Sequence, residues 1–395
     1  MSCVIFGQAA ADFRKEACKT AWADFTHGVT AKVQHGNSFM KVLVAMSGGV
    51  DSSVCAKLLT EKGYECTGCT MKLYDNKEEQ KKNMKSCCSL DDVEDARSVA
   101  FSLGMNYYVF NFMDDFKEKV IDKFVSSYEQ GLTPNPCIDC NRYMKFSKLY
   151  DRAKILGCDA LATGHYARIE KSDGRYVLKK AKDLSKDQSY VLYFLTQDDL
   201  AHTLFPLGDY TKPQTREMAL EGGFINAGKP DSQDICFVPD GKYADIVEKY
   251  SGKPSAPGNF ITPEGKILGQ HKGIIHYTLG QGRGLGLSLP QKGYVCRICP
   301  EDNTVVVGQK EDLMGFEAVA SDFNWISGKI PEEPVRCFAK ARYRQAEQPC
   351  CAYPLEDGRV KVVFDEAQRA ITPGQALVLY DGDTVLGGGV IEKRY

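Results

Sequence analysis

Residues 41–53, with the sequence KVLVAMSGGVDSS, place residue types suited to phosphate binding in one short segment. The first part is an apolar run typical of a buried strand, and apolar residues at helical spacing follow Ser53. Between them, Gly48 and Gly49 allow a backbone turn in which a larger side chain would clash. Because backbone amides at such a turn and at a helix N-terminus bind anions, the segment predicts a nucleotide phosphate site.

The turn lacks the lysine that a Walker loop places against the β- and γ-phosphates, so it suits pyrophosphate better than a γ-phosphate awaiting hydrolysis. It resembles the loop of ATP pyrophosphatases, which cleave ATP between its α- and β-phosphates and leave AMP on an acceptor. The resemblance implies ATP and Mg²⁺ as cofactors, with Asp51 organising Mg²⁺ and pyrophosphate. The implied ATP contacts are Ala45, Met46, Ser47, Gly48, Gly49, Val50, Asp51, Ser52, Ser53, Met71 and Gly164.

Six further segments narrow the acceptor: TPNPCIDCN at 133–141, GHYAR at 164–168, KDQSYVL at 186–192, DSQDICFV at 231–238, HYTLGQ at 276–281 and ARYRQ at 341–345. Together they resemble the tRNA-specific 2-thiouridylases from Met40 to the C-terminus. Enzymes of that family adenylate C2 of the wobble uridine and replace its oxygen with sulfur. The resemblance implies tRNA contacts at Asn135, Pro136, Cys137, His165, Lys186, Asp187, Gln188, Arg342, Tyr343 and Gln375.

That chemistry needs thiols. A uracil carbonyl is a poor electrophile, so its oxygen must first become a leaving group, which transfer of AMP achieves. Sulfur must then arrive as a strong nucleophile, from a cysteine persulfide or a metal-bound sulfide. By resemblance, Cys236 bears the persulfide and Cys140 is its catalytic partner. The sulfur donor stays open between a persulfide carrier, a cysteine desulfurase and inorganic sulfide.

The chain departs from the family at one position of this site. After Asn135 and Pro136 the family usually has aspartate, whereas this chain has Cys137, which forms a CxxC pair with Cys140. With Cys236, three thiols are available for catalysis. Three thiolates and one open position suit a 4Fe-4S cluster, while zinc or dithiol redox chemistry would use the same residues. Any proton transfer by the family's aspartate must also be performed differently here.

Other segments have similar spacings but lack the sequence context of the motifs assigned above. Two more CxxC spacings, at 66–69 and 296–299, fall in predicted strands, where residues three apart point to opposite faces and cannot readily share a metal. Around 137–140, prolines predict a loop instead. The segment 223–229, GFINAGK, has Walker spacing, but Pro230 replaces the required serine or threonine and no strand precedes it. We therefore do not expect a nucleotide site there.

Composition favours an ordinary globular enzyme. The 395 residues, 43% of them hydrophobic, are enough for two or three domains. Sixteen cysteines in this composition indicate thiols kept reduced, so we expect a cytoplasmic protein. No apolar run approaches the length of a membrane span, and we expect no membrane partner. Because the net charge is -2, any attraction for tRNA must come from local basic patches.

Alternating strands and helices from 41 to about 165 predict an α/β fold with a doubly wound parallel sheet, which binds ligands beyond the carboxyl ends of its strands. The predicted parts are an extension of unknown role at 1–39, a catalytic ATP pyrophosphatase domain at 40–238 with a helical tRNA-binding part, a small central β domain at 239–312, and a tRNA-binding antiparallel β-barrel at 313–395. The extension reads as an upstream start or a floppy segment.

Two rival functions share parts of this pattern. A small-molecule ligase of the argininosuccinate or guanylate synthetase kind would need ATP, but neither three thiols nor a C-terminal barrel. A non-catalytic tRNA-binding or iron-sensing module would keep the fold without the chemistry.

Overall fold

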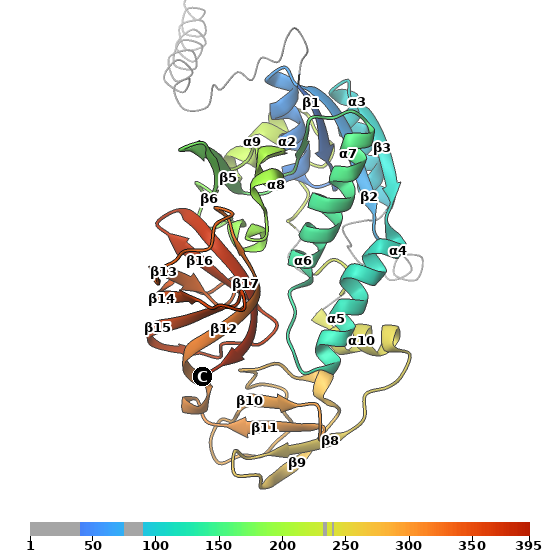
Figure 1. Ribbon diagram of the computed structural model, residues 1–395. Coiled ribbons are helices and arrows are strands. Elements are labelled where there is room, and N and C mark those ends of the chain that lie inside the picture. The colour runs from blue at the N-terminus through green and yellow to red at the C-terminus, as the bar shows by residue number, and fades with distance from the viewer. Residues whose placement is uncertain (1–39, 75–89, 232–234, 239–240) are drawn as a thin grey trace, which may run out of the picture. The chain divides into compact units, whose positions relative to one another are not determined.

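The computed structural model describes residues 40–74, 90–231, 235–238 and 241–395 (Figure 1). The extension at 1–39 lies outside these ranges. Within them, every helix is too short or too polar to cross a membrane.

A five-stranded parallel sheet forms the centre of the catalytic domain, as predicted. Its strand order is β3-β2-β1-β4-β7. The strands are β1 (Lys41–Ala45), β2 (Glu65–Lys72), β3 (Asn106–Asn111), β4 (Ala160–Ala162) and β7 (Thr203–Leu204). The side chains of Val42, Leu43 and Val44 are fully buried. A strand covered on both faces needs such a continuous apolar run, which is why the sequence identified β1.

Helices surround this sheet and continue below it. They are α2 (Val50–Glu61), α3 (Leu90–Ser102), α4 (Met113–Phe116), η2 (Lys117–Ile121), α5 (Asp122–Glu129), α6 (Pro136–Asp139), η3 (Cys140–Leu149) and α7 (Tyr150–Ile155). The segments η2 and η3 are π-helical. The CxxC therefore begins in the first turn, and ends in the second turn, of a helix that runs without a break from Pro136 to Ile155.

The prediction of a loop at 137–140 was wrong, and the reason is the capping chemistry. Proline is well suited to the first helical position, where Pro136 lies, because the amide it lacks would have no helical partner. Asn135 is the N-cap, and its side chain accepts a hydrogen bond from the amide of Cys137 at 3.2 Å. The prolines that exclude a strand thus begin a helix.

A hairpin that the sequence analysis did not predict follows β4 in the chain. Its strands β5 (Ala167–Ser172) and β6 (Arg175–Lys180) are antiparallel, and β6 pairs with the C-terminal barrel through Lys179 and Thr384. The next elements are η4 (Ser189–Leu192), α8 (Gln197–Ala201), α9 (Lys212–Glu221) and α10 (Tyr243–Ser251). The hairpin connects the catalytic domain to the barrel in one hydrogen-bonded sheet.

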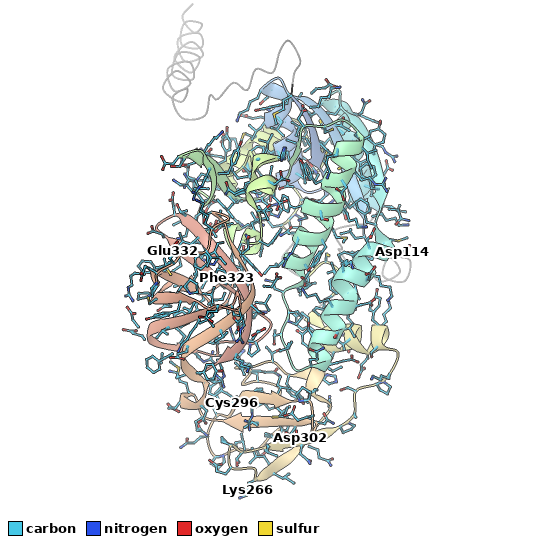
Figure 2. All side chains as sticks on the ribbon, viewed as in Figure 1. Asp114, Lys266, Cys296, Asp302, Phe323 and Glu332 are labelled. Atoms are coloured by element: carbon cyan, nitrogen blue, oxygen red, sulfur yellow. The ribbon has the colours of Figure 1, made fainter. Side chains whose placement is uncertain are left out.

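The central β domain has four strands in the order β10-β11-β8-β9. They are β8 (Gly258–Ile261), β9 (Ile267–His271), β10 (Tyr294–Cys299) and β11 (Thr304–Gly308), with η6 (Ile274–His276) between β9 and β10. Cys296, labelled in Figure 2, and Cys299 both lie in β10. The other control pair, Cys66 and Cys69, lies in β2. Both extra CxxC spacings are in strands, as expected.

The predicted C-terminal barrel is present, coloured orange to red in Figure 1. After η7 (Glu311–Leu313) its strands are β12 (Met314–Trp325), β13 (Val335–Lys340), β14 (Gln348–Pro354), β15 (Val360–Arg369), β16 (Ala376–Asp381) and β17 (Thr384–Arg394). All their pairings are antiparallel, and β12 pairs with β17 to close the barrel.

Arg342, two residues after the end of β13, joins this barrel to the central domain. Its Nη2 donates to the carbonyls of Leu279 at 3.2 Å and Ala370 at 2.8 Å, and to the hydroxyl of Thr372. Burial, with the nearby charge of Arg369, lowers the pKa of the Arg342 guanidinium from its ordinary value. Because Nη2 bonds acceptors in both the central domain and the barrel, Arg342 holds these two domains together. The predicted tRNA contact of Arg342 stays a prediction.

We expect Arg342→Met to lower the free energy of unfolding by about 2–4 kcal/mol, because several carbonyls lose a charged donor at once. Urea denaturation of the tRNA-free protein measures this change. The matched control is Arg344→Met, on an exposed side chain two residues further on, which should stay within about 0.5 kcal/mol of the parent. Equal stability of the two variants would contradict the joining role.

Candidate active site

The phosphate loop leaves the carboxyl end of β1 and enters α2, where it packs tightly against a neighbouring segment. Gly48 has a φ of +73°, in the left-handed region that favours glycine. A Cβ atom there would lie 2.2 Å from the carbonyl oxygen of Asp92. The glycine is therefore required both by the turn and by the close approach of this second backbone.

The serines of the loop fold back on the turn. The amide of Ser47 donates to Oγ of Ser52 at 3.1 Å, and the hydroxyls of Ser52 and Ser53 donate to the carbonyl of Gly49 at 3.0 and 3.1 Å. Among the described residues, no side chain caps the first turn of α2. The first-turn amides of a helix of this length, without a capping side chain, form an anion-binding end.

Two further expected ATP contacts lie close to this loop. A Cβ at Gly164 would be 2.9 Å from both the carbonyl carbon of Asp51 and the amide nitrogen of Ser52, so the chain after β4 packs directly on the start of α2. Met71 lies near the carboxyl end of β2, the strand paired with β1. The structure thus brings the separate segments to one edge of the sheet, as the parallel topology predicts.

A chain of alternating charges, missed by sequence reasoning, extends from the loop. Both carboxylate oxygens of Asp51 lie 2.7–2.8 Å from Nζ of Lys212, at the first position of α9. The same Nζ is 2.8 Å from Oδ1 of Asp231, and Oδ2 of Asp231 is 2.8 Å from Nζ of Lys186. We call this Asp51–Lys212–Asp231–Lys186 series the ion chain. Because these four residues are far apart in sequence, no local sequence pattern could predict their contacts.

The cations around Asp231 keep it ionised. Burial opposes ionisation, but hydrogen bonds and positive charge from Lys186 and Lys212 outweigh it and lower the pKa of Asp231 to about 2. Arg216 adds a third cation, with Nη2 2.7 Å from Oδ1. Beside Asp51, burial and the aspartate charge raise the pKa of Tyr166, whose hydroxyl donates to Oδ1 at 2.9 Å. Tyr166 is thus a neutral donor.

The segment 223–229, set aside as a false Walker match, forms one wall of this site. Nδ2 of Asn226 donates to the carbonyl of Gly48 and to Oγ of Ser53, both at 2.9 Å. Nζ of Lys229 lies 3.3 Å from the same carbonyl and 2.8 Å from Oδ2 of Asp95. The segment is no nucleotide loop in itself, yet it places an amide and a lysine against the phosphate loop.

The thiol region lies where the other motifs meet. Cys137 and Cys140 are one helical turn apart, and residues at this spacing share a face. Burial, followed by the charges of Asp187 and Cys137, raises the pKa of Tyr343. The hydroxyl of Tyr343 donates to the carbonyl of Asp187 at 3.1 Å. The KDQ and ARYRQ motifs, far apart in sequence, are therefore in contact.

A cavity of about 320 Å³ connects the two cysteine segments. It is lined by Tyr128, Thr133, Pro134, Asn135, Pro136, Ile235, Tyr243, Thr278 and Gln375. Pro136 directly precedes Cys137, and Ile235 directly precedes Cys236. The amide of Gln375, predicted to contact tRNA, donates to the carbonyl of Thr133 at 2.7 Å. Residues from the catalytic domain, the central domain and the barrel thus enclose one space.

The Cys236 segment is also attached to the sheet. The hydroxyl of Tyr74, just beyond β2, donates to the carbonyl of Cys236 at 2.6 Å. In the ranges that the structure describes, however, no three His, Cys, Asp or Glu side chains are grouped so that they could hold a metal ion. The arrangement of Cys137, Cys140 and Cys236 therefore does not fit the expected 4Fe-4S or zinc site.

Several predicted tRNA contacts have internal partners. His165 is 7% exposed, with Nδ1 2.6 Å from the hydroxyl of Thr163. Burial, together with the charge of Lys145, lowers its pKa well below 6.5, so the ring is neutral at physiological pH. Asp187 accepts from the amide of Ala181 at 3.0 Å. Gln188 likewise bonds the backbone of Tyr166. These side chains shape the site, and their tRNA contacts stay predictions.

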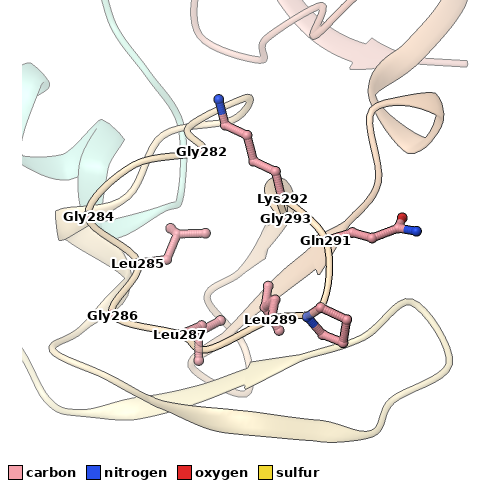
Figure 3. Close-up of a pocket in the computed structure, with 10 residues that line it drawn as sticks. Gly282, Gly284, Leu285, Gly286, Leu287, Leu289, Gln291, Lys292 and Gly293 are labelled. Atoms are coloured by element: carbon pink, nitrogen blue, oxygen red, sulfur yellow. The ribbon is translucent and has the colours of Figure 1, made fainter.

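A second cavity, of about 310 Å³, lies in the glycine-rich loop of the central domain. Figure 3 shows Leu285, Leu287 and Leu289 along this loop, with Lys292 on the other side. None of the predicted site residues lines it. We therefore assign it no part in the site.

Comparison with known proteins identifies relatives over most of the chain. Family models match for the tRNA methyl transferase HUP domain at residues 40–240, the tRNA methyl transferase PRC-barrel domain at 244–309, and the aminomethyltransferase beta-barrel domain at 317–391. The chain is 52% identical to the tRNA-specific 2-thiouridylase MnmA of Clostridioides difficile (strain 630), over 89% of this chain and 98% of that protein. It is 51% identical to the protein of the same name from Acetivibrio thermocellus, over 89% and 99%.

One solved structure is similar at a lower level. A 4-thiouridine synthetase–RNA complex with bound ATP aligns over 54% of this chain and 52% of that chain, with 17% identity and a TM-score of 0.32. This similarity is too low to bear on the site.

We expect Gly48→Ala to weaken binding of Mg-ATP at least about tenfold, because the new Cβ would collide with the Asp92 backbone and displace the loop. Isothermal titration measures the dissociation constant. Gly63→Ala is a matched control, since Gly63 has a φ of +83° but nothing within 4 Å of its Cβ position. The control should bind the nucleotide like the parent, and equal binding by both variants would contradict the packing argument.

Proposed function

Because this chain belongs to the family of tRNA-specific 2-thiouridylases, we propose that it catalyses the ATP-dependent 2-thiolation of the wobble uridine of tRNA. One observation supports this most strongly. The ion chain bonds Asp51 of the phosphate loop to Asp231, five residues before Cys236. Five residues span at most about 17 Å, so the sulfur-bearing cysteine lies within reach of the phosphate site.

In the first step the C2 oxygen of the uridine attacks the α-phosphorus of ATP, pyrophosphate leaves, and the proton on N3 of the base is released to solvent. The amides at the start of α2 hold the anionic leaving group, and helix N-termini favour such negative charge. Asp51 supplies carboxylate oxygens of the kind that Mg²⁺ prefers, and so would hold the Mg²⁺ that enters with ATP. The product of this step is AMP bonded to the former carbonyl oxygen.

In the second step the terminal sulfur of a Cys236 persulfide attacks C2, and AMP leaves with the former C2 oxygen. A disulfide then links Cys236 to the base. The thiolate of Cys140 attacks the Cys236 sulfur, which releases 2-thiouridine and leaves a Cys140–Cys236 disulfide. An external thiol must reduce this disulfide, and a persulfide donor must reload Cys236.

The cavity between the cysteine segments is our candidate for the uridine pocket. It is lined by the residues that directly precede Cys137 and Cys236, and Asn135 offers an amide to the edge of a base. The rings of Tyr128 and Tyr243 lie stacked at 6.1 Å, an aromatic wall of the type on which unstacked RNA bases rest. Thr278 and Gln375 close the space from the other two domains.

We expect Cys236→Ser to abolish 2-thiouridine in cells that depend on this protein, because no sulfur can be loaded. Pyrophosphate release stimulated by tRNA should remain measurable in vitro, since adenylation needs no thiol. Mass spectrometry of hydrolysed tRNA and a pyrophosphate assay measure the two outcomes. Cys158→Ser, a cysteine outside the cavity, is the control and should behave like the parent.

Unchanged thiouridine in the Cys236→Ser cells would favour a non-catalytic tRNA-binding module. Pyrophosphate release stimulated by small metabolites and not by tRNA would favour a small-molecule ligase. Either result would overturn the proposal.

Cys137→Asp restores the aspartate usual in the family, and we expect it to keep the thiolation rate within about threefold of the parent. Persulfide chemistry needs only Cys140 and Cys236, so a third thiolate is dispensable. The measurement is thiolation of unmodified tRNA with a persulfide donor, by protein purified without oxygen and assayed for iron. A loss above about tenfold in a folded variant, with iron bound only by the parent, would show instead that three thiolates hold a metal.

A further inference from the structure

The ion chain has an unequal exposure along its length. Lys186, the first residue of the KDQ motif at one end, is 38% exposed, and Asp51 at the other end is 34% exposed. Between them Lys212 is only 9% exposed. Asp231, the other middle member, is 23% exposed, so the two ends are the most exposed members of the ion chain and Lys212 is the most buried.

The charges of this cluster are shared and not paired one to one. Lys186, Lys212 and Arg216 all bond the single carboxylate of Asp231. Lys212 is in turn divided between Asp231 and Asp51. When one cation leaves Asp231, the remaining ones are attracted to it more strongly, because the opposing charges interact in a partly buried site with weak solvent screening. A change at one end thus alters the bonding at the other.

We propose that Asp231 is a positioning residue that couples the binding of tRNA to the binding of Mg-ATP. This inference rests on the proposed function, because it takes Lys186 as a tRNA contact and Asp51 as the carboxylate for Mg²⁺. A tRNA phosphate draws Lys186 away from Asp231. Asp231 then attracts Lys212, and Asp51 is left free to bind the Mg²⁺ of the nucleotide.

The same exchange operates in the opposite direction. Mg²⁺ at Asp51 repels Lys212 and drives it towards Asp231, which weakens the hold of Asp231 on Lys186. Lys186 is then available to a tRNA phosphate. The two ligands must raise each other's affinity by the same factor, as linkage requires. Adenylation is thereby favoured when both substrates are present, which limits unproductive cleavage of ATP.

The local structure shows why Asp231 is the shared element. Lys186 adjoins Asp187, whose carbonyl accepts the hydroxyl of Tyr343 from the barrel. By contrast, Lys229 also touches the phosphate loop, but its carboxylate partners Asp92 and Asp95 both lie on α3. Of these two charge clusters, it is the ion chain that connects the phosphate loop to the KDQ motif.

The test measures the dissociation constant of Mg-α,β-methylene-ATP, which cannot be cleaved at the reactive bond, with and without unmodified tRNA. In the parent protein we expect tRNA to tighten nucleotide binding at least about fivefold. In Asp231→Asn we expect the ratio of the two constants to fall to about one, and in Asp231→Glu to recover in part. Thermal melting checks that each variant is folded.

Glu170→Gln is the matched control, because Glu170 is also shared between two cations, Arg168 and Lys179, but does not bond the ion chain. Its ratio should equal that of the parent. If Asp231→Asn weakens both bindings and keeps the parental ratio, the residue is merely structural and the inference is wrong. If the parent thiolates tRNA but shows no coupling, the inference is wrong and the proposed function still holds. If the parent neither thiolates tRNA nor releases pyrophosphate with it, the proposed function fails.

Discussion

A lysine buried between two carboxylates is the constraint on which the rest of the site depends. The side chain of Lys212 is 9% exposed, and Asp51 and Asp231 both bond its ammonium. Removing either partner of such a buried pair typically destabilises a protein by about 3–5 kcal/mol. The phosphate loop, the start of α9 and the segment leading to Cys236 are consequently held together by charge, although more than 100 residues separate Asp51 from the other two in sequence.

The KDQ motif connects this network to the thiols. Its lysine faces Asp231, and its next residue accepts the Tyr343 hydroxyl from the barrel side of the molecule. The hairpin β5–β6 extends the barrel sheet to the same region, and Gln375 bonds the backbone ahead of the CxxC helix. The barrel therefore positions the catalytic segments whether or not it also contacts tRNA.

Much of the fold was predictable because its determinants are local. The apolar run of β1 and the glycine turn identify the sheet and the phosphate loop, and alternating strands with glycine turns identify the barrel. The parts that were missed depend on context. Proline excludes a strand equally well in a loop and at a helix start, so only the capping by Asn135 decides the conformation of the CxxC. Lys212, Asn226 and Lys229 reach the site through tertiary packing, which leaves no periodicity in the sequence.

The central chemical claim is that the C2 oxygen of the uridine becomes part of AMP. A tRNA carrying ¹⁸O at C2 of the wobble uridine tests it in one turnover with ATP and a persulfide donor. Mass spectrometry should find one ¹⁸O in AMP, none in pyrophosphate and 2-thiouridine in the tRNA. AMP without the label, while thiouridine forms, would contradict adenylation of the base and with it the account of the site.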